Sequence, residues 1–184
     1  MEFSVLETDL GAVLLFAREK DLCRLDLVAS GPAAARERAA AEFPGALEEP
    51  RSFEAGARLL RRYFSGEEVE FDIPVDLFGL EAFTRAVLTE IRHIPYGGLA
   101  SYGAIARRLG RPSAARAVGQ ALARNPIPIV IPCHRIIRGD DSLGGFGMGL
   151  DMKERLLSIE GVDVHRLRKE VGFPQRTESQ RVGV

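Results

Sequence analysis

The chain has 184 residues, enough for one sizeable domain or for two small domains with apolar cores of their own. Its composition, 46% hydrophobic and 28% charged, is ordinary for a globular protein, and no apolar run approaches the roughly 20 residues that a membrane-spanning helix needs. Because the first residues lack the basic and apolar segments of a signal peptide, we expect a cytoplasmic monomer without membrane contact, whose two cysteines stay reduced.

Charge is distributed unevenly along the chain, although the net charge is only −1. Residues 1–98 carry 11 basic and 18 acidic side chains, whereas residues 99–139 carry seven arginines and no acidic residue. A basic island within an acidic chain is the electrostatic pattern expected for contact with nucleic-acid phosphates. The alternative is a solvated charged face that pairs with the acidic half, and charge alone does not separate the two.

The first part of the chain alternates short strands and helices, separated by turn residues. This pattern predicts a small α+β domain over residues 1–76, with no obvious chemistry on it. The expected elements are strands at residues 2–8, 11–17 and 22–29, helices at 33–43 and 52–65, and a short strand at 71–73.

From residue 79 the pattern becomes mostly helical, and we predict a second domain over residues 79–162. Two of its helices, joined by a tight turn with glycine, have a helix-turn-helix outline, in which Ser101 is the candidate N-cap of the first. Many short helix pairs look like this and bind nothing. The expected helices are at residues 83–94, 101–110, from 113 or 114 to about 124, and 151–160.

Three further segments complete the chain. The apolar residues 127–131 are expected to form a buried strand that delivers Cys133. Glycines at 144, 145, 147 and 149 are expected to form a flexible lid, because their spacing fits neither type of phosphate-binding loop. The polar tail, residues 163–184, is predicted to be partly helical to Lys169 and frayed beyond it.

A nucleophile is predicted at Cys133, which lies between a proline and His134. Nucleophilic sulfur needs the thiolate form, which an imidazole or a cationic neighbour favours. Adjacent residues of an extended segment point to opposite sides, so direct contact of the two side chains would need a turn or a water molecule. Glu160 is a candidate third member that orients the imidazole, and Tyr102 could donate a hydrogen bond to a leaving group. Cys23 is interpreted as an inert core thiol.

No metal or cofactor is expected. The three histidines, His93, His134 and His165, are scattered, and the adjacent pair of Cys133 and His134 cannot form a tetrahedral site alone.

Five linked motifs extend through the second half of the chain. They are IPYG with SYG at residues 94–97 and 101–103, AARAVG at 114–119, NPIP at 125–128, IPCHR at 131–135 and KERLLSIEG at 153–161. Over roughly residues 80–161 the chain thereby resembles the O6-alkylguanine-DNA alkyltransferases, also called methylated-DNA–protein-cysteine methyltransferases. The N-terminal half is similar to the variable α/β domain of that family in outline only.

The resemblance implies an α+β protein, with a ribonuclease H-like outline in the N-terminal domain and a mostly helical C-terminal domain that holds the helix-turn-helix and the active-site cysteine. It also implies direct-reversal DNA repair. Such a protein binds double-stranded DNA in the minor groove, flips an O6-alkylguanine out of the stack and transfers the alkyl group irreversibly to Cys133. O4-alkylthymine is an expected second substrate. The thioether product has no good leaving group, so the reaction should be stoichiometric.

The resemblance also assigns residue roles. His134, acting through a water molecule, would take the thiol proton, Glu160 would orient His134, and Tyr102 would donate a proton or hydrogen bond to the departing guanine. Arg116 would fill the gap left by the flipped base, and Asn125 would brace the turn before the active site. The other expected DNA contacts are Thr84, Gly103, Arg111, Ala115, Gly119, Arg124 and Arg135. The expected alkylguanine pocket consists of Leu122, Pro128, Ile136, Phe146, Gly147 and Met148.

Three positions depart from the usual family pattern. Phe146 stands where many members have a tyrosine, Gly147 where a serine or alanine is common, and Met148 where a glycine is usual. Three alternatives predict other features. A silent alkyltransferase-like protein would lack Cys133, and a helix-turn-helix regulator would not need Cys133, His134 and Glu160. A cysteine hydrolase would turn over and would need no basic island.

Overall fold

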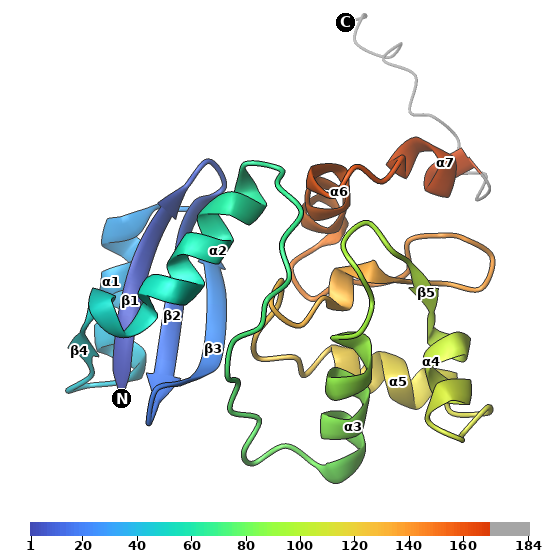
Figure 1. Ribbon diagram of the computed structural model, residues 1–184, viewed down its shortest axis with the longest axis horizontal. Coiled ribbons are helices and arrows are strands. Elements are labelled where there is room, and N and C mark those ends of the chain that lie inside the picture. Colours follow the sequence, from blue (N-terminus) through green and yellow to red (C-terminus); the bar gives the residue numbers. More distant parts are fainter. Residues whose placement is uncertain (170–184) are drawn as a thin grey trace, which may run out of the picture.

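The computed structural model describes residues 1–169, and the side chains up to residue 167. Its N-terminal half is a curved sheet with one helix on each face (Figure 1). This confirms the predicted α+β order, and the ends of the first three strands lie within a residue of those expected, whereas β4 was not predicted. The elements are β1 (Glu2–Thr8), β2 (Gly11–Arg18), β3 (Asp21–Val28), α1 (Pro32–Glu42), β4 (Leu47–Glu48), the 3-10 helix η1 (Pro50–Phe53) and α2 (Glu54–Phe64).

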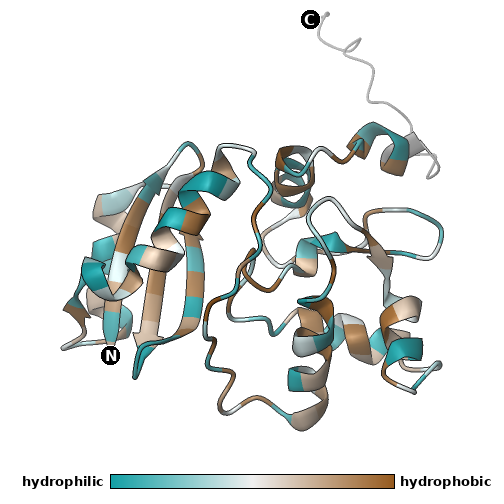
Figure 2. Ribbon diagram, in the orientation of Figure 1, coloured by the Kyte–Doolittle hydropathy of each residue, from teal (hydrophilic) through white to brown (hydrophobic). Residues whose placement is uncertain are grey.

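The strands are arranged in the order β3-β2-β1-β4, antiparallel except for the β1–β4 pair. Strand β2 is buried on both faces, because alternate side chains enter two different cores. Leu14 and Phe16 pack under α1, whereas Val13 and Leu15 belong to the larger core that includes α2 and the C-terminal half. The edge strand β3 alternates apolar and polar residues along its length (Figure 2).

The C-terminal half is mostly helical, as predicted. It contains α3 (Ala82–Ile91), β5 (Ala100–Ser101), α4 (Tyr102–Arg108), α5 (Ala115–Leu122), the 3-10 helix η2 (Cys133–Arg135), β6 (Ile136–Ile137), α6 (Leu150–Ile159) and α7 (Val164–Lys169). The predicted frayed segment after Lys169 lies outside the described residues.

Helices α4 and α5 form the expected helix pair, and α3 packs against both. The Ser101 hydroxyl accepts a hydrogen bond from the Ala104 amide at 3.1 Å, so Ser101 is the N-cap of α4. The chain turns after α4 at Gly110, whose φ of +69° suits glycine. Helix α5 begins at Ala115 and ends at Leu122, slightly shorter than expected.

The edge of β3 joins the two halves of the chain. Leu22 exchanges backbone hydrogen bonds with the linker, receiving one from the Asp76 amide at 2.8 Å and donating one to Pro74. The Leu25 amide donates to the Pro126 carbonyl at 2.9 Å, directly before the active-site loop. An exposed strand edge is thereby covered, and the C-terminal half is held against the sheet.

The strand predicted at residues 71–73 is wrong. This segment is extended and buries Phe71, but the structure assigns it no strand. Its carbonyl groups are satisfied by a side chain instead, because the Arg92 guanidinium donates to Phe71 O at 3.3 Å and to Ile73 O at 3.1 Å. None of the described helices is long and apolar enough to cross a membrane.

Candidate active site

Cys133 is held at the end of a buried turn rather than a strand, which corrects the expectation for residues 127–131. The turn closes with a hydrogen bond from the Ile131 amide to the Ile127 carbonyl at 2.9 Å, and Ile129 has a φ of +74°. Proline at 128 and 132 supplies no N–H for a strand ladder, so the apolar run cannot pair as a strand. Its hydrophobicity reflects burial, which a strand and a core turn share.

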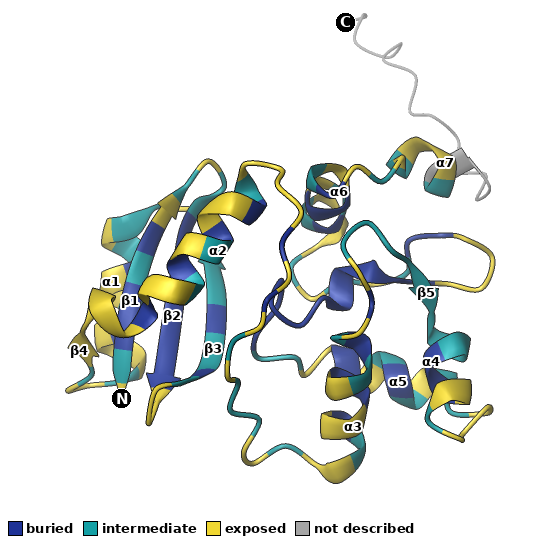
Figure 3. Cartoon of the chain, viewed as in Figure 1, coloured by how far each residue is buried: buried dark blue, intermediate teal, exposed yellow. Residues whose placement is uncertain are grey.

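The residues Cys133, His134 and Arg135 form the 3-10 helix η2, all buried in the centre of the C-terminal half (Figure 3). The expectation that neighbouring side chains point to opposite sides rested on an extended backbone, so it does not apply here. About three residues complete a 3-10 turn, which sends consecutive side chains in different directions around the axis. Cys133 as a residue is 8% exposed, whereas His134 is fully buried.

Asn125 ties the end of the α5 segment to the cysteine. Its Nδ2 donates to the Ile131 carbonyl at 2.8 Å and contacts Cys133 Sγ at 3.1 Å. Its Oδ1 accepts from the Ile127 amide at 3.0 Å. One side chain thus spans the turn and places an amide N–H against the sulfur, where it can stabilise developing negative charge.

A buried acid–base pair is formed by His134, the residue that follows the cysteine, and Glu160. His134 Nε2 is 2.6 Å from Glu160 Oε1, and both side chains are fully buried. A carboxylate at this distance requires the proton on Nε2, so the neutral ring presents Nδ1 as its acceptor. Nδ1 has no hydrogen-bond partner among the described residues. It is therefore free to accept a proton.

Glu160, at the C-cap of α6, receives hydrogen bonds from four residues. Besides His134, the Arg135 guanidinium donates to Oε2 at 2.9 Å and to Oε1 at 3.0 Å, and the Gly97 amide donates to Oε2 at 3.0 Å. The fourth donor is the Tyr63 hydroxyl, 2.9 Å from Oε1. A buried carboxylate with this many donors is fixed in orientation and stays ionised.

The environment separates the charge states of the pair. Burial alone would raise the pKa of Glu160, but the hydrogen bonds from His134 and Arg135 outweigh it and bring that pKa down to about 2. Burial lowers the pKa of His134 below its ordinary value, and the bond to Glu160 opposes this only in part. At neutral pH the site therefore holds an ionised Glu160 and a neutral imidazole, as a general base requires.

Cys133 is a thiol in the resting protein. Burial raises the pKa of the Cys133 thiol above its ordinary value, although the Asn125 amide and the Lys153 ammonium oppose the shift. Lys153 is itself buried, and it donates to the carbonyl groups of Ile136 and Leu143. Burial lowers the pKa of Lys153 to about 8. The sulfur must therefore lose its proton as the reaction occurs.

Tyr102, the first residue of α4, lies against the glycine-rich loop. Its hydroxyl donates to the Gly145 carbonyl at 3.4 Å, a long contact that a ligand could replace. Gly144 has a φ of +68°, and a Cβ atom there would lie 2.9 Å from the Tyr102 hydroxyl oxygen. Burial raises the pKa of Tyr102, and the nearby Arg138 guanidinium opposes the shift only in part. Tyr102 therefore stays a protonated donor near the sulfur.

The predicted DNA-contact residues separate into two groups. Arg116 on α5 is exposed, as are Arg111, which stacks over the Phe83 ring at 5.1 Å, and Arg124, 3.3 Å from Glu81. Gly103, Ala115 and Gly119 are partly exposed on the same helix pair. These six residues remain candidates for a surface that meets DNA phosphates.

Thr84 and Arg135 do not fit the predicted contact with DNA, and we correct both assignments. Thr84 is 1% exposed in α3, and Arg135 is 5% exposed. The Arg135 guanidinium is used internally, since it donates to Glu160 and, at 2.5 Å, to the Ile94 carbonyl. The arginine that follows the cysteine and histidine therefore belongs to the acid–base network.

The residues predicted for the alkylguanine pocket differ in exposure. Phe146 and Met148 are partly exposed and pack against the main core, and Gly147 is exposed. Leu122 and Pro128 are buried. Ile136 is fully buried and its carbonyl accepts from Lys153, which corrects its assignment to the pocket.

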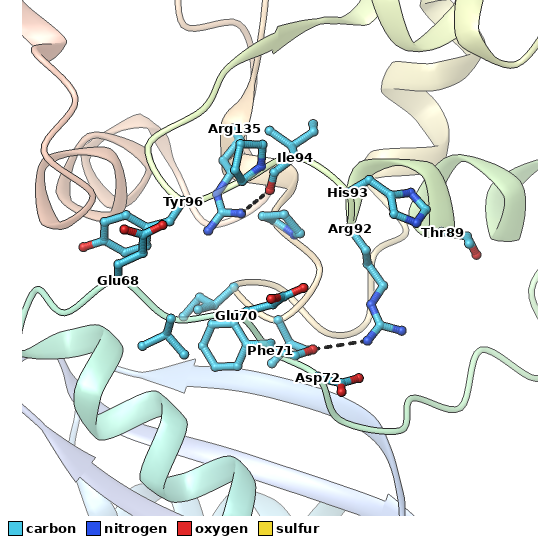
Figure 4. Close-up of a pocket in the computed structure, with 15 residues that line it drawn as sticks. Glu68, Glu70, Phe71, Asp72, Thr89, Arg92, His93, Ile94, Tyr96 and Arg135 are labelled. Atoms are coloured by element: carbon cyan, nitrogen blue, oxygen red, sulfur yellow. Dashed lines mark hydrogen bonds between the residues drawn. The ribbon is translucent and has the colours of Figure 1, made fainter.

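A separate cleft of about 660 Å³ lies between the linker and the C-terminal half (Figure 4). Glu70 and Phe71 form one side of it, and Arg92, Tyr96 and Arg135 lie across from them (Figure 4). Of the predicted site residues, only Arg135 appears among the described residues that line it. This cleft therefore shares Arg135 with the acid–base network and is distinct from the predicted alkylguanine pocket.

Two functional positions escaped sequence reasoning. Tyr63 comes from α2, in the half that showed no chemistry, and no local pattern marks it. Lys153 lies inside a recognised motif, where its charge predicts a surface residue, yet it is fully buried.

No group of three or more histidine, cysteine, aspartate or glutamate side chains in the described part of the chain could hold a metal ion.

Two family models match the chain. The one described as "6-O-methylguanine DNA methyltransferase, ribonuclease-like domain" matches residues 1–77, and the one described as "6-O-methylguanine DNA methyltransferase, DNA binding domain" matches residues 82–162. The methylated-DNA–protein-cysteine methyltransferase of Mycolicibacterium paratuberculosis is 42% identical over 160 residues, which cover 87% of this chain and 92% of the relative.

Further relatives agree. The enzyme of the same name from Methanosarcina acetivorans is 37% identical over 162 residues, covering 88% of this chain and 99% of its own. Among solved structures, Mycobacterium tuberculosis OGT in complex with DNA superposes with a TM-score of 0.75 at 34% identity, covering 87% of this chain and 92% of that chain. The chain belongs to the 6-O-methylguanine DNA methyltransferase family.

Proposed function

We propose that the protein reverses DNA damage by moving the alkyl group of an O6-alkylguanine to Cys133, once per chain. The observation that carries this proposal is the buried hydrogen bond between His134 and Glu160, whose imidazole belongs to the residue that follows Cys133 in a chain of this family. A base next to a buried nucleophile is the arrangement that nucleophilic transfer needs.

The reaction balances in one displacement. The Cys133 thiol gives its proton, through a water molecule, to Nδ1 of His134, and the sulfur attacks the alkyl carbon. An S–C bond forms while the bond between that carbon and guanine O6 breaks. The guanine leaves as an anion, which Tyr102 stabilises by donating a hydrogen bond or a proton. The Asn125 amide, 3.1 Å from Sγ, stabilises the thiolate before attack.

The site must receive the damaged base outside the duplex, because the alkyl carbon cannot be reached within the stack. Unstacking costs a few kcal/mol, and an inserted side chain offsets part of that cost. Arg116, exposed on α5, is the side chain that we assign to this gap. The small residues Ala115 and Gly119 on the same helix suit the minor groove, about 6 Å wide.

The proposed test is intact-protein mass after incubation with a duplex that contains a single O6-methylguanine. We expect one added CH2 group per chain, mapped to Cys133, which saturates at one even with excess DNA. The undamaged duplex of the same sequence is the control. Lesion-selective binding without added mass would contradict the transfer reaction. The same assay with a duplex that contains O4-methylthymine tests the second predicted substrate.

The cytoplasmic location, the monomeric state and the domain limits stay predictions.

Gly144→Ala is expected to slow alkyl transfer by about tenfold or more, because the new methyl group would crowd the Tyr102 hydroxyl and displace the donor. The positive φ at Gly144 adds a stability cost of about 1 kcal/mol. Single-turnover kinetics on the O6-methylguanine duplex measure the effect. Gly145→Ala is the matched control, since nothing lies within 4 Å of a Cβ atom there. Equal rates in the two variants would contradict the role of Tyr102.

Met148 is expected to restrict the size of the alkyl group. Its partly exposed side chain packs at the edge of the loop that is predicted to cover the base. Met148→Gly should therefore raise the rate with O6-benzylguanine while changing the rate with O6-methylguanine little. Competition between the two substrates measures the ratio, and an unchanged ratio would show that Met148 does not set the preference.

A further inference from the structure

Tyr63 reaches from the N-terminal half into the acid–base network. It lies on α2, its side chain is fully buried, and its hydroxyl donates to Glu160 Oε1 at 2.9 Å. The same hydroxyl lies 3.4 Å from His134 Nε2. Because that nitrogen donates its proton to Glu160, the hydroxyl of Tyr63 and the ring of His134 share one carboxylate oxygen.

The ring contacts of Tyr63 do not require its hydroxyl group. The ring makes edge contacts with Phe64, Tyr96 and His134, with centroid separations of 5.5, 6.1 and 6.4 Å, and a phenylalanine ring could make the same contacts. Burying a phenol costs free energy unless its O–H finds a partner. Glu160 is that partner, so the position of the hydroxyl and the position of the carboxylate determine each other.

We infer that Tyr63 is a positioning residue of the alkyl-transfer site, through which the N-terminal half holds Glu160 and His134 in the geometry that accepts the thiol proton. The inference rests on the proposed function and extends it to a residue outside the C-terminal domain. The two halves are then coupled in catalysis as well as in folding, because α2 supplies a donor that no C-terminal element replaces in the described structure.

The charged neighbours define what the loss of this hydroxyl would do. Glu160 also faces Arg135 and lies near Tyr96, while His134 lies near Arg135 and Lys153. With one donor fewer, the carboxylate is less stabilised and attracts the imidazole proton more strongly. The base is then protonated at a higher pH and is less well oriented. Both effects slow alkyl transfer, most strongly at acidic pH.

Tyr63→Phe tests the inference, with Tyr96→Phe as the matched control. The Tyr96 hydroxyl also bridges the two halves, donating to Ile159 O at 2.7 Å and lying 3.2 Å from Gly66 O, but it does not contact the carboxylate. Single-turnover rates on the O6-methylguanine duplex are measured from acidic to neutral pH. We expect alkyl transfer by Tyr63→Phe to be about tenfold slower than by the wild type. The acidic limb of its rate–pH profile should lie at higher pH. Tyr96→Phe should keep the wild-type limb.

The outcomes are distinguishable. If the wild type takes up no alkyl group, the proposed function fails, and the inference fails with it. If the wild type is active but Tyr63→Phe follows the wild-type pH profile, only the inference is overturned. Should Tyr63→Phe unfold, NMR of the wild type decides: the Tyr63 hydroxyl proton should exchange slowly and show a nuclear Overhauser contact to the His134 ring. A rapidly exchanging hydroxyl without that contact overturns the inference.

Discussion

Cys133→Ala is expected to abolish alkyl uptake completely while leaving the protein folded and able to bind the damaged duplex. The substitution removes only Sγ from a side chain that contacts the Asn125 amide, and Asn125 keeps its bonds to Ile131 and Ile127. Deleting one buried atom costs about 1 kcal/mol. Because no other thiol lies near His134 and Glu160 in the described residues, nothing can replace the acceptor.

Intact mass measures the loss of uptake, and a gel-shift titration with the O6-methylguanine duplex measures the retained binding. Cys23→Ala is the control. Cys23 lies on the edge strand β3, and its sulfur donates to the carbonyl of Phe16 on β2 at 3.4 Å. Burial raises the pKa of the Cys23 thiol above its ordinary value. Cys23→Ala should take up the alkyl group at the wild-type rate. Uptake by Cys133→Ala, or its loss in Cys23→Ala, would place the acceptor elsewhere.

Much of the fold could be predicted because its signals are local. The strands of the N-terminal sheet follow from alternation between turn residues, and helix α4 follows from Ser101 as N-cap and Gly110 as stop. The run at residues 127–131 could not be assigned this way. Its burial on all sides gives the same hydrophobic pattern as a core strand, and only the prolines indicated that a ladder was impossible.

The candidate site was predictable as far as its motifs extend. His134 and Glu160 are in hydrogen-bond contact, whereas the joint role of these two residues with Cys133 stays a prediction. The predicted contact of Arg135 with DNA was wrong. An arginine in a basic island suggests a phosphate contact, but the Arg135 guanidinium forms an ion pair with Glu160. Tyr63 was unpredictable because its partner lies 97 residues away in the chain, and such a pairing exists only in the folded protein.

Glu160→Gln is expected to slow alkyl transfer by about 10²- to 10⁴-fold, because His134 loses the charge that fixes its tautomer and stabilises it once protonated. The same change leaves Arg135, 5% exposed, without its anionic partner. An uncompensated buried charge costs about 3–5 kcal/mol of unfolding free energy at neutral pH. Single-turnover kinetics give the first quantity and urea unfolding gives the second. Asp151→Asn, an exposed acid in the first turn of the same helix, should cost under about 1 kcal/mol.

The stability difference between the wild type and Glu160→Gln should also depend on pH in a defined direction. The pKa of Glu160 is about 2 in the folded protein, below its ordinary value of 4.5. A carboxyl with a lowered folded pKa contributes stability that is fully present above the unfolded value and is lost as pH falls toward the folded value. The difference should therefore be constant above about pH 5 and shrink as pH falls from about 4.5 toward 2. A difference that stays constant through this range would mean that Glu160 is not ionised in the folded site, and His134 would then lack the anion that its role as a base requires.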